Sequence, residues 1–230
     1  MNNINLQRQM IKLVARALGP ELLDQVVFVG GCTTGLLVTD DFTKEQIRYT
    51  EDVDLIVHVI SKGDWYQLQQ QLREKGFNED MESSDGVICR MLLDGLKVDF
   101  MPDDPKILSF SNRWYPKAMK SAELYQIAEN VNIRLIKPEY FIATKIEAFK
   151  GRGNNDPISS HDIEDLLNLF DGRNELVDEI KAADNDVQGF ISDELKKLLS
   201  SDGFEYAVQS ASSNNTDRES LIFERLEMCI

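Results

Sequence analysis

The sequence predicts an α+β protein, with a mixed β-sheet in the first part of the chain and a helical domain after it. Within residues 1–136, short β-branched runs alternate with apolar residues at helical spacing. Asp94-Gly95 separates two apolar runs as the turn of a hairpin does, and Glu129-Asn130 separates two more. From Pro138 onward the patterns are mainly helical. We therefore expect a core domain at 1–136 and a helical domain at 137–230, with a functional site in the cleft between them.

Each element of the core domain follows from a local pattern. Gly19-Pro20 ends the first helix, and Gly30-Gly31 forms a turn after the first strand. The expected helices are 7–18, 33–38 and 65–75, the expected strands are 26–29, 52–59, 87–93, 96–101, 124–128 and 131–136, and residues 40–46 are expected to form a loop.

The helical domain begins with a proline in the first turn of its first helix, where proline is favoured. A polar, glycine-rich loop follows at 151–157. Ser160 is the expected N-cap of a helix at 162–170, and Asp171-Gly172 is expected to end that helix. Further helices are expected at 176–182, 187–199 and 220–228, with a loop at 211–215.

The composition argues against several classes of protein. The net charge of −15 disfavours broad, non-specific binding to nucleic acid, because such binding depends on neutralising phosphates. No apolar run reaches the ~18–20 residues of a membrane helix, and the N-terminus lacks the basic start and apolar stretch of a signal peptide. With three widely spaced cysteines and two histidines, we expect a cytoplasmic protein without disulfides or a zinc site.

The segment 106–120 contains no acidic residue and so departs from this acidity. Arg113, Lys117 and Lys120 have spacings of four and three, so on a helix they would share one face. Trp114 or Tyr115, between these charges, would stack on an unpaired base. The segment predicts a path for an RNA acceptor. The alternative is a solvated helix face with aromatic side chains packed beneath it.

Two aspartates lie at the start of an apolar, β-branched run. Side chains at i and i+2 of a strand share a face, so Asp52 and Asp54 would project together, with Val53 and Leu55 turned into the core. Neighbouring carboxylates repel each other unless a cation neutralises them, and Mg²⁺ prefers carboxylates together with substrate phosphates. The later hairpin would lay a third acid, Asp99, beside this strand. These residues predict a site for Mg²⁺ or Mn²⁺; the alternative is a solvated strand end.

The glycine turn predicts a phosphate site. A backbone without Cβ lets a phosphate approach Gly30 and Gly31 closely, and the helix that follows offers free N–H groups. Gly31, Cys32 and Thr33 would present backbone and hydroxyl donors to that phosphate. Taken alone, a glycine pair is more often an ordinary turn.

Taken in order, these motifs resemble the nucleotidyltransferase superfamily, whose pattern is Gly-Gly or Gly-Ser on a turn, then Asp-x-Asp on a strand, then a third Asp on a later strand. Gly30-Gly31 matches the turn, Asp52 and Asp54 match the pair, and Asp99 matches the third acid. The resemblance covers residues 26–170. It implies a mixed-sheet nucleotidyltransferase core with two metal ions, in which Asp52 and Asp54 bind both ions and Asp99 binds the one on the nucleophile side.

The long gap between the turn and the pair is similar to that of the AbiEii/MenT-like toxin branch. Arg48, two residues before a threonine, matches the Arg-x-Thr of that branch. Lys145 matches its helical lysine, which implies a phosphate clamp, and Asp162 and Asp165 match its later Asp-x-x-Asp. The resemblance implies that Arg48 binds phosphate and that Asp162 orients the lysine or contacts base or ribose. The alternatives are that Arg48 pairs with Glu51, that Lys145 is a surface lysine paired with Glu147 or Asp162, and that Asp165 only faces solvent. His161 stands where the family often has arginine.

The resemblance implies an enzyme that moves NMP from an NTP to an acceptor hydroxyl and releases pyrophosphate. Relatives of the toxin branch further imply the toxin of a bacterial toxin–antitoxin or phage-defence system, with an antitoxin protein as partner and the 3′ end of tRNA as one acceptor. One alternative is nucleotidyl transfer to a protein or to a small molecule such as an aminoglycoside. Another is a catalytically silent relative that binds nucleotide.

Overall fold

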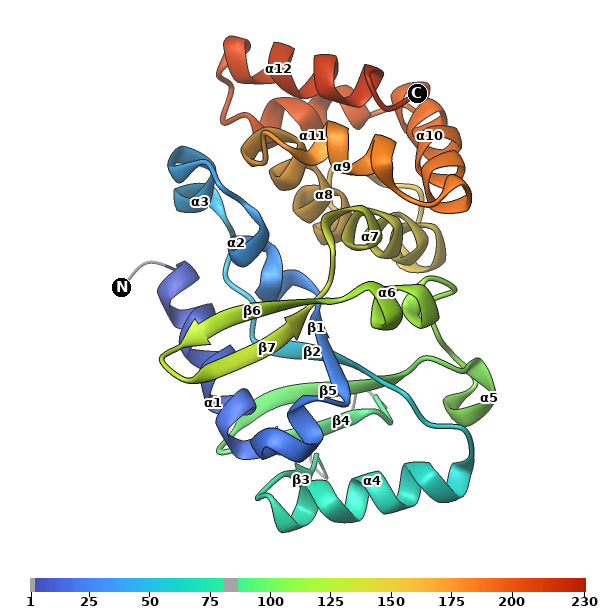
Figure 1. Ribbon diagram of the computed structural model, residues 1–230. Coiled ribbons are helices and arrows are strands. Elements are labelled where there is room, and N and C mark those ends of the chain that lie inside the picture. Colours follow the sequence, from blue (N-terminus) through green and yellow to red (C-terminus); the bar gives the residue numbers. More distant parts are fainter. Residues whose placement is uncertain (1–2, 81–86) are drawn as a thin grey trace. The chain divides into compact units, whose positions relative to one another are not determined.

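The computed structural model describes residues 3–80 and 87–230 (Figure 1). These residues form two compact units. The sheet unit comprises the chain up to Thr33 together with Arg48–Lys137, and the helical unit comprises Thr34–Ile47 and Pro138–Ile230. The chain therefore leaves the sheet unit directly after the glycine turn and returns to it before the Asp52–Asp54 strand.

A mixed seven-stranded sheet forms the sheet unit, with its strands in the order β3-β4-β5-β2-β1-β7-β6. β1 pairs antiparallel with β2 and parallel with β7, and β2 pairs parallel with β5. The pairs β3–β4, β4–β5 and β6–β7 are antiparallel. The strands are β1 (Val26–Val29), β2 (Asp52–Val57), β3 (Asn78–Glu79), β4 (Arg90–Leu93), β5 (Leu96–Pro102), β6 (Glu123–Ala128) and β7 (Val131–Leu135).

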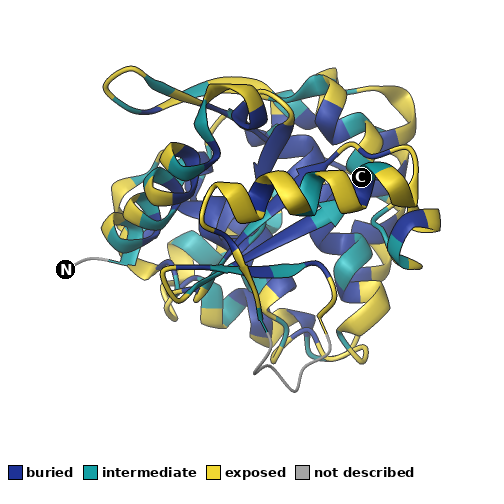
Figure 2. Cartoon of the chain, turned by 90° about the horizontal axis from the view of Figure 1, so that it is seen from below, coloured by how far each residue is buried: buried dark blue, intermediate teal, exposed yellow. Residues whose placement is uncertain are grey.

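Residues coloured as buried lie mainly on the strands of the sheet, and residues coloured as exposed lie on the helices and loops (Figure 2). All four residues of β1 are buried. In β2, Val53 and Leu55 are fully buried, as the alternation of side chains predicts. The rings of Phe77 and Phe100 pack edge to face, with centroids 5.4 Å apart. The aspartates of β2 therefore stand on a strand that apolar packing holds in place.

The helices of the sheet unit are α1 (Asn3–Leu23), the 3-10 helix η1 (Gly31–Thr33), α4 (Lys62–Glu74), α5 (Pro105–Leu108) and α6 (Tyr115–Ser121). α1 packs on β6 and β7, and α6 packs on β1 and β2. Gly19 interrupts α1 with a non-helical backbone (φ 69°, ψ 171°), which confirms the break predicted at Gly19-Pro20. No helix in the described part of the chain is long and apolar enough to cross a membrane.

The helical unit is built around α8, which contacts α2, α3, α7, α11 and α12. The Ser160 side chain accepts a hydrogen bond from Ile163 N at 3.3 Å and caps this helix, as predicted. The helices of the unit are α2 (Thr34–Leu37), α3 (Asp41–Gln46), α7 (Pro138–Arg152), α8 (His161–Gly172), α9 (Leu176–Ala182), α10 (Asn185–Leu199), α11 (Phe204–Ala211) and α12 (Thr216–Glu227).

Both predicted hairpins are confirmed. Asp94 and Gly95 adopt positive φ angles of 50° and 83° between β4 and β5, as a tight hairpin turn requires. Asn130, with a φ of 57°, closes the hairpin of β6 and β7. The α+β class, with a mixed sheet followed by a helical C-terminal region, is therefore correct.

One local prediction is wrong. The expected loop at 40–46 is helix α3, because the Asp40 side chain accepts from Thr43 N at 2.9 Å and caps it. The helix expected at 33–38 is present but shorter: α2 covers Thr34–Leu37 and directly follows η1. Helix α11, which buries Phe204, Ala207 and Val208 against its neighbours, was not predicted.

Gly172 is predicted to be required for the packing of α8 against residues 38–43. A Cβ added there would lie 2.6 Å from Val38 Cγ1 and 2.7 Å from Thr43 Cβ. Gly172→Ala should therefore lower the free energy of unfolding by about 1–3 kcal/mol. The matched control is Gly189→Ala within α10, because a Cβ added at Gly189 meets nothing within 4 Å. This substitution should stabilise the helix by up to about 1 kcal/mol. Chemical denaturation measures both, and equal effects would contradict the prediction.

Candidate metal centre

Three carboxylates meet on one face of the sheet unit. The parallel register of β2 and β5 places Asp54 directly opposite Asp99, and Asp52 lies two residues before Asp54 on the same face. One oxygen from each side chain lies within 4.8 Å of the others. Opposite ligands of a single Mg²⁺ ion lie about 4 Å apart. The structure therefore brings together the three acids that the sequence selected, in an arrangement that can hold a metal ion.

The surroundings of the three acids are apolar and electrically negative. Asp99 is 7 % exposed, whereas Asp52 and Asp54 are half-buried. Burial, and next the charge of Asp54, raise the pKa of the Cys32 thiol. Burial, and next the charge of Asp99, raise the pKa of Cys89 to about 12. Both thiols are therefore neutral at ordinary pH, which argues against a thiolate nucleophile here.

Arg90 is a residue of this site that the sequence analysis missed. It lies on β4 directly opposite Asp99. Its Nε and Nη2 atoms donate to the two Asp99 oxygens, each at 2.8 Å, and Nη2 lies 3.9 Å from Asp52 Oδ2. The hydrogen bonds to Asp99 raise the pKa of the guanidinium, which stays charged. The signal that could have revealed Arg90 is its position across the Asp94-Gly95 turn, which fixes its register with Asp99.

Gly30 allows the turn to pass next to Asp54. Its φ is +74°, and a Cβ added there would lie 1.8 Å from Asp54 Oδ2 and 2.7 Å from Asp54 Cβ. Any side chain would therefore occupy the space of the carboxylate. The sequence predicted that Gly30 lets a phosphate come close. In the structure, a glycine is required at this position because the Asp54 carboxylate fills the space of a Cβ.

The other residues assigned to the glycine turn are mostly enclosed. Gly31 and Thr33 are buried in η1. Thr33 is 0 % exposed, and its N–H and hydroxyl both donate to the Gly30 carbonyl, at 3.1 Å and 2.8 Å. Arg48 is half-buried, and its carbonyl accepts from Gln7 Nε2 at 2.9 Å. The donors of Thr33 thus stabilise the turn, and contact of these residues with nucleotide remains a prediction.

Lys145 and Asp162 belong to an ion-pair cluster in the helical unit. Lys145 Nζ donates to Asp162 at 3.3 Å and to Asp165 at 2.5 Å, and all three side chains are buried. Arg152 makes two further hydrogen bonds to Asp162, at 2.9 Å and 2.8 Å. Asp162 is thus positioned to orient Lys145. The alternative that Asp165 faces solvent is wrong, because Asp165 is 0 % exposed.

The charge of Asp162 is stabilised where it lies. Burial alone would raise its pKa, but the hydrogen bonds from Arg152 and the charge of Lys145 outweigh burial and lower it. Because the pKa is lowered on folding, the contribution of Asp162 to stability is present above its ordinary value of 3.8 and is lost as the pH falls through the lowered value. The cluster therefore supports the fold of the helical unit at neutral pH.

The acid-free segment does not form the single helical face that was predicted. Arg113 precedes α6, which begins at Tyr115, so it does not share a helix with Lys117 and Lys120. The guanidinium of Arg113 lies over the Trp114 ring, 4.8 Å from its centroid. Trp114 is 2 % exposed and cannot stack on a base in this conformation. The alternative of aromatics packed beneath a charged surface describes Trp114 better.

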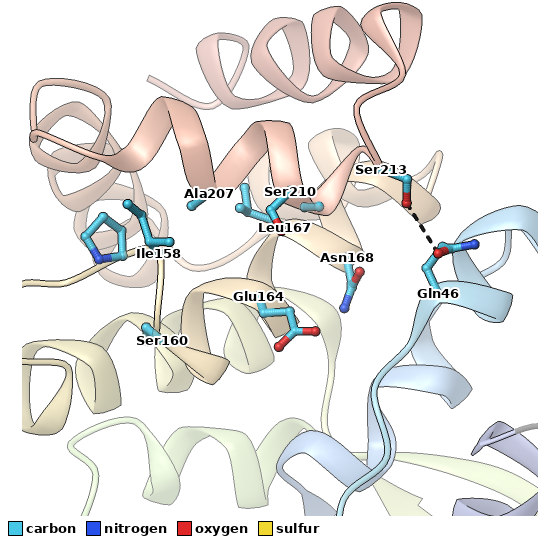
Figure 3. Close-up of a pocket in the computed structure, with 11 residues that line it drawn as sticks. Gln46, Ile158, Ser160, Glu164, Leu167, Asn168, Ala207, Ser210 and Ser213 are labelled. Carbon is cyan, nitrogen blue, oxygen red and sulfur yellow. Dashed lines mark hydrogen bonds between the residues drawn. The ribbon is translucent and has the colours of Figure 1, made fainter.

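The helical unit also contains a polar pocket of about 230 Å³ (Figure 3). Glu164 and Asn168 point into it from α8 (Figure 3). Ser213 donates to Gln46 Oε1 at 3.3 Å across its rim. The Nδ2 atom of Asn168 is buried and has no hydrogen-bond partner among the described residues. None of the site residues predicted from the sequence lines this pocket, so it shares no residue with the candidate metal centre.

In comparisons with known proteins, no family model and no curated protein matches the chain. The functional conclusion therefore depends on the geometry of the three carboxylates and on the resemblance of the motifs that supply them.

Gly30→Ala is predicted to damage the metal centre beyond the strain of its backbone. Gly95→Ala is the matched control, because Gly95 also has a positive φ, +83°, but a Cβ there meets nothing within 4 Å. Both variants should lose about 1–2 kcal/mol of stability through backbone strain. Gly30→Ala should lose more and should also weaken Mn²⁺ binding, because Asp54 must move. Equal stability and equal Mn²⁺ affinity of the two variants would count against this assignment.

Lys145→Ala is predicted to destabilise the protein by about 3–5 kcal/mol, because it leaves two buried carboxylates without their shared cation. Lys150→Ala, in the same helix, is the control. Lys150 is 42 % exposed and pairs with Glu194 at 3.0 Å, so its loss should cost about 0–1 kcal/mol. Urea denaturation measures both, and similar midpoints would show that the buried cluster does not support the fold.

Proposed function

We propose that the protein is a metal-dependent nucleotidyltransferase that moves NMP from an NTP to an acceptor hydroxyl and releases pyrophosphate. The observation that carries the proposal is the meeting of Asp52, Asp54 and Asp99 on one face of a mixed sheet. Gly30 lies directly beside Asp54. The order of glycine turn, acid pair and third acid along the chain, which resembles the superfamily pattern, supports the same conclusion.

The chemistry of the donor set fits Mg²⁺ or Mn²⁺. All three side chains offer hard carboxylate oxygens, which these ions prefer. The carboxylates outnumber Arg90, the guanidinium that pairs with two of them, so added positive charge would stabilise the cluster. When bound, the cation would activate the attacking oxygen and stabilise the leaving one.

The residues around that cation would have different roles. Asp52 and Asp54 would hold it, and Arg90 fixes the orientation of Asp99. The Gly30-Gly31 turn would lie beside the triphosphate, and the missing side chain of Gly30 leaves room for Asp54. A phosphate-binding role for Lys145 rests on the resemblance, and it requires Nζ to exchange one of its two aspartate partners for phosphate.

The acceptor and the biological role rest on the resemblance to the toxin branch. The acceptor would be an RNA, such as the 3′ end of tRNA. The protein would act as the toxin of a toxin–antitoxin or phage-defence pair, with an antitoxin as partner. A small cationic acceptor of the aminoglycoside type would suit the acidic composition, and a protein acceptor is a further alternative. A catalytically silent, nucleotide-binding role is favoured by one observation, the pairing of Arg90 with both oxygens of Asp99.

Labelling with NTPs tests the proposal. The protein is incubated with each α-labelled NTP, Mg²⁺, and total RNA or lysate, and the labelled product is identified. The wild type should label one class of acceptor, and Asp52→Asn and Asp54→Asn should each lower the labelling at least about 100-fold by removing a metal ligand. EDTA should abolish the labelling.

Asp94→Asn is the matched control. It makes the same chemical change in the hairpin turn, where asparagine tolerates the φ of 50°, and it should label as the wild type does. If no NTP yields a labelled product with the wild type, or if both β2 variants keep their activity, the proposed function is wrong.

A further inference from the structure

Arg90 and the candidate metal ion require the same carboxylate. Both oxygens of Asp99 accept from the guanidinium at 2.8 Å, and the side chains of Arg90 and Asp99 are each 10 % exposed. A cation bound to Asp99 in this arrangement would lie within a few ångströms of the guanidinium. At short range and low exposure, like charges repel strongly. Arg90 therefore competes with a metal ion for Asp99.

Arg90 is also suited to a triphosphate. A guanidinium that binds a carboxylate through two parallel hydrogen bonds can bind a phosphate group with the same geometry. Asp99 lies opposite Asp54, which the Cβ-free Gly30 approaches. A triphosphate beside this turn would offer Arg90 a more highly charged partner than Asp99, and the number of hydrogen bonds would be kept.

We propose that Arg90 couples the two binding events of this site, pairing with Asp99 in the nucleotide-free protein and moving to the triphosphate when an NTP binds. The inference rests on the proposed function. Asp99 then becomes available to the metal ion only when nucleotide is present. The nucleotide-free protein holds a cation weakly, through Asp52 and Asp54, and by linkage each ligand strengthens the binding of the other.

The coupling predicts changes of opposite sign in one variant. Arg90→Gln removes the competitor of the metal ion and the partner of the triphosphate together. It should bind Mn²⁺ at least about 10-fold more tightly than the wild type, within the usual range of coupling between sites. It should also bind inorganic triphosphate with Mg²⁺ at least about 10-fold more weakly. A residue that only supports the sheet would weaken both kinds of binding when removed.

Mn²⁺ binding is measured by electron paramagnetic resonance of the free ion, and triphosphate binding by calorimetry. Lys97→Gln is the matched control, because Lys97 precedes Asp99 by two residues on β5 and pairs with the exposed Glu51 at 3.4 Å. It removes the same charge from the neighbouring strand and should change either affinity by no more than about threefold, since exposed pairs contribute little. Arg90→Lys keeps the positive charge but cannot form two parallel hydrogen bonds, so it should show the same two changes to a smaller extent. Circular dichroism verifies that each variant is folded.

The outcomes separate the inference from the proposed function. If the wild type binds no Mn²⁺ even when inorganic triphosphate is present, the metal centre and the proposed function both fail. If the wild type binds Mn²⁺ but the folded Arg90 variants bind it equally or more weakly, the competition is wrong and the metal centre stands. If Mn²⁺ binds more tightly while triphosphate binding is unchanged, Arg90 does not move to the phosphate and the coupling is overturned.

Discussion

The candidate site depends on one unfavourable contact, the placement of Asp54 directly opposite Asp99. The parallel register of β2 and β5 fixes this pair, and fully buried neighbours, Val53 and Phe100 among them, hold the register. A shift of one residue would turn these apolar side chains to the other face, so the apolar packing keeps the carboxylates together. Like charges opposite each other destabilise a sheet, and the surrounding structure compensates for this repulsion.

Two neighbours of the pair illustrate the compensation. Arg90, across the hairpin from Asp99, supplies a charge and two hydrogen bonds. Gly30 supplies space, because it leaves room for a carboxylate that any Cβ would displace. Even so, the pKa values of the nearby Cys32 and Cys89 thiols are raised, mainly by burial and in addition by the negative charge of the acids. The local potential is therefore still negative once Arg90 is in place.

The sequence predicted the parts of this site that depend on local pattern. Alternation along β2 placed Asp52 and Asp54 on one face, and the Asp94-Gly95 turn brought Asp99 to that strand. Arg90 was missed because its role arises from register across the hairpin, which gives a single arginine no periodic signal. Helix α3 was missed for a similar reason: its polar sequence resembles a loop, and the contacts that bury Thr43 come from distant parts of the chain.

The helical unit shows how such acids behave when their charge is matched. The carboxylates of Asp162 and Asp165 are paired there with Lys145 and Arg152, and the pKa of Asp162 is lowered although the side chain is buried. Asp40 and Asp171 share Arg218 in the same unit, with distances of 2.8 Å and 2.7 Å. In the sheet unit, by contrast, Asp52, Asp54 and Asp99 lie together beside Arg90. Buried charge is tolerated where it is paired, so three acids gathered within reach of one another form a candidate site for a cation, whereas the clusters of the helical unit are structural ion pairs.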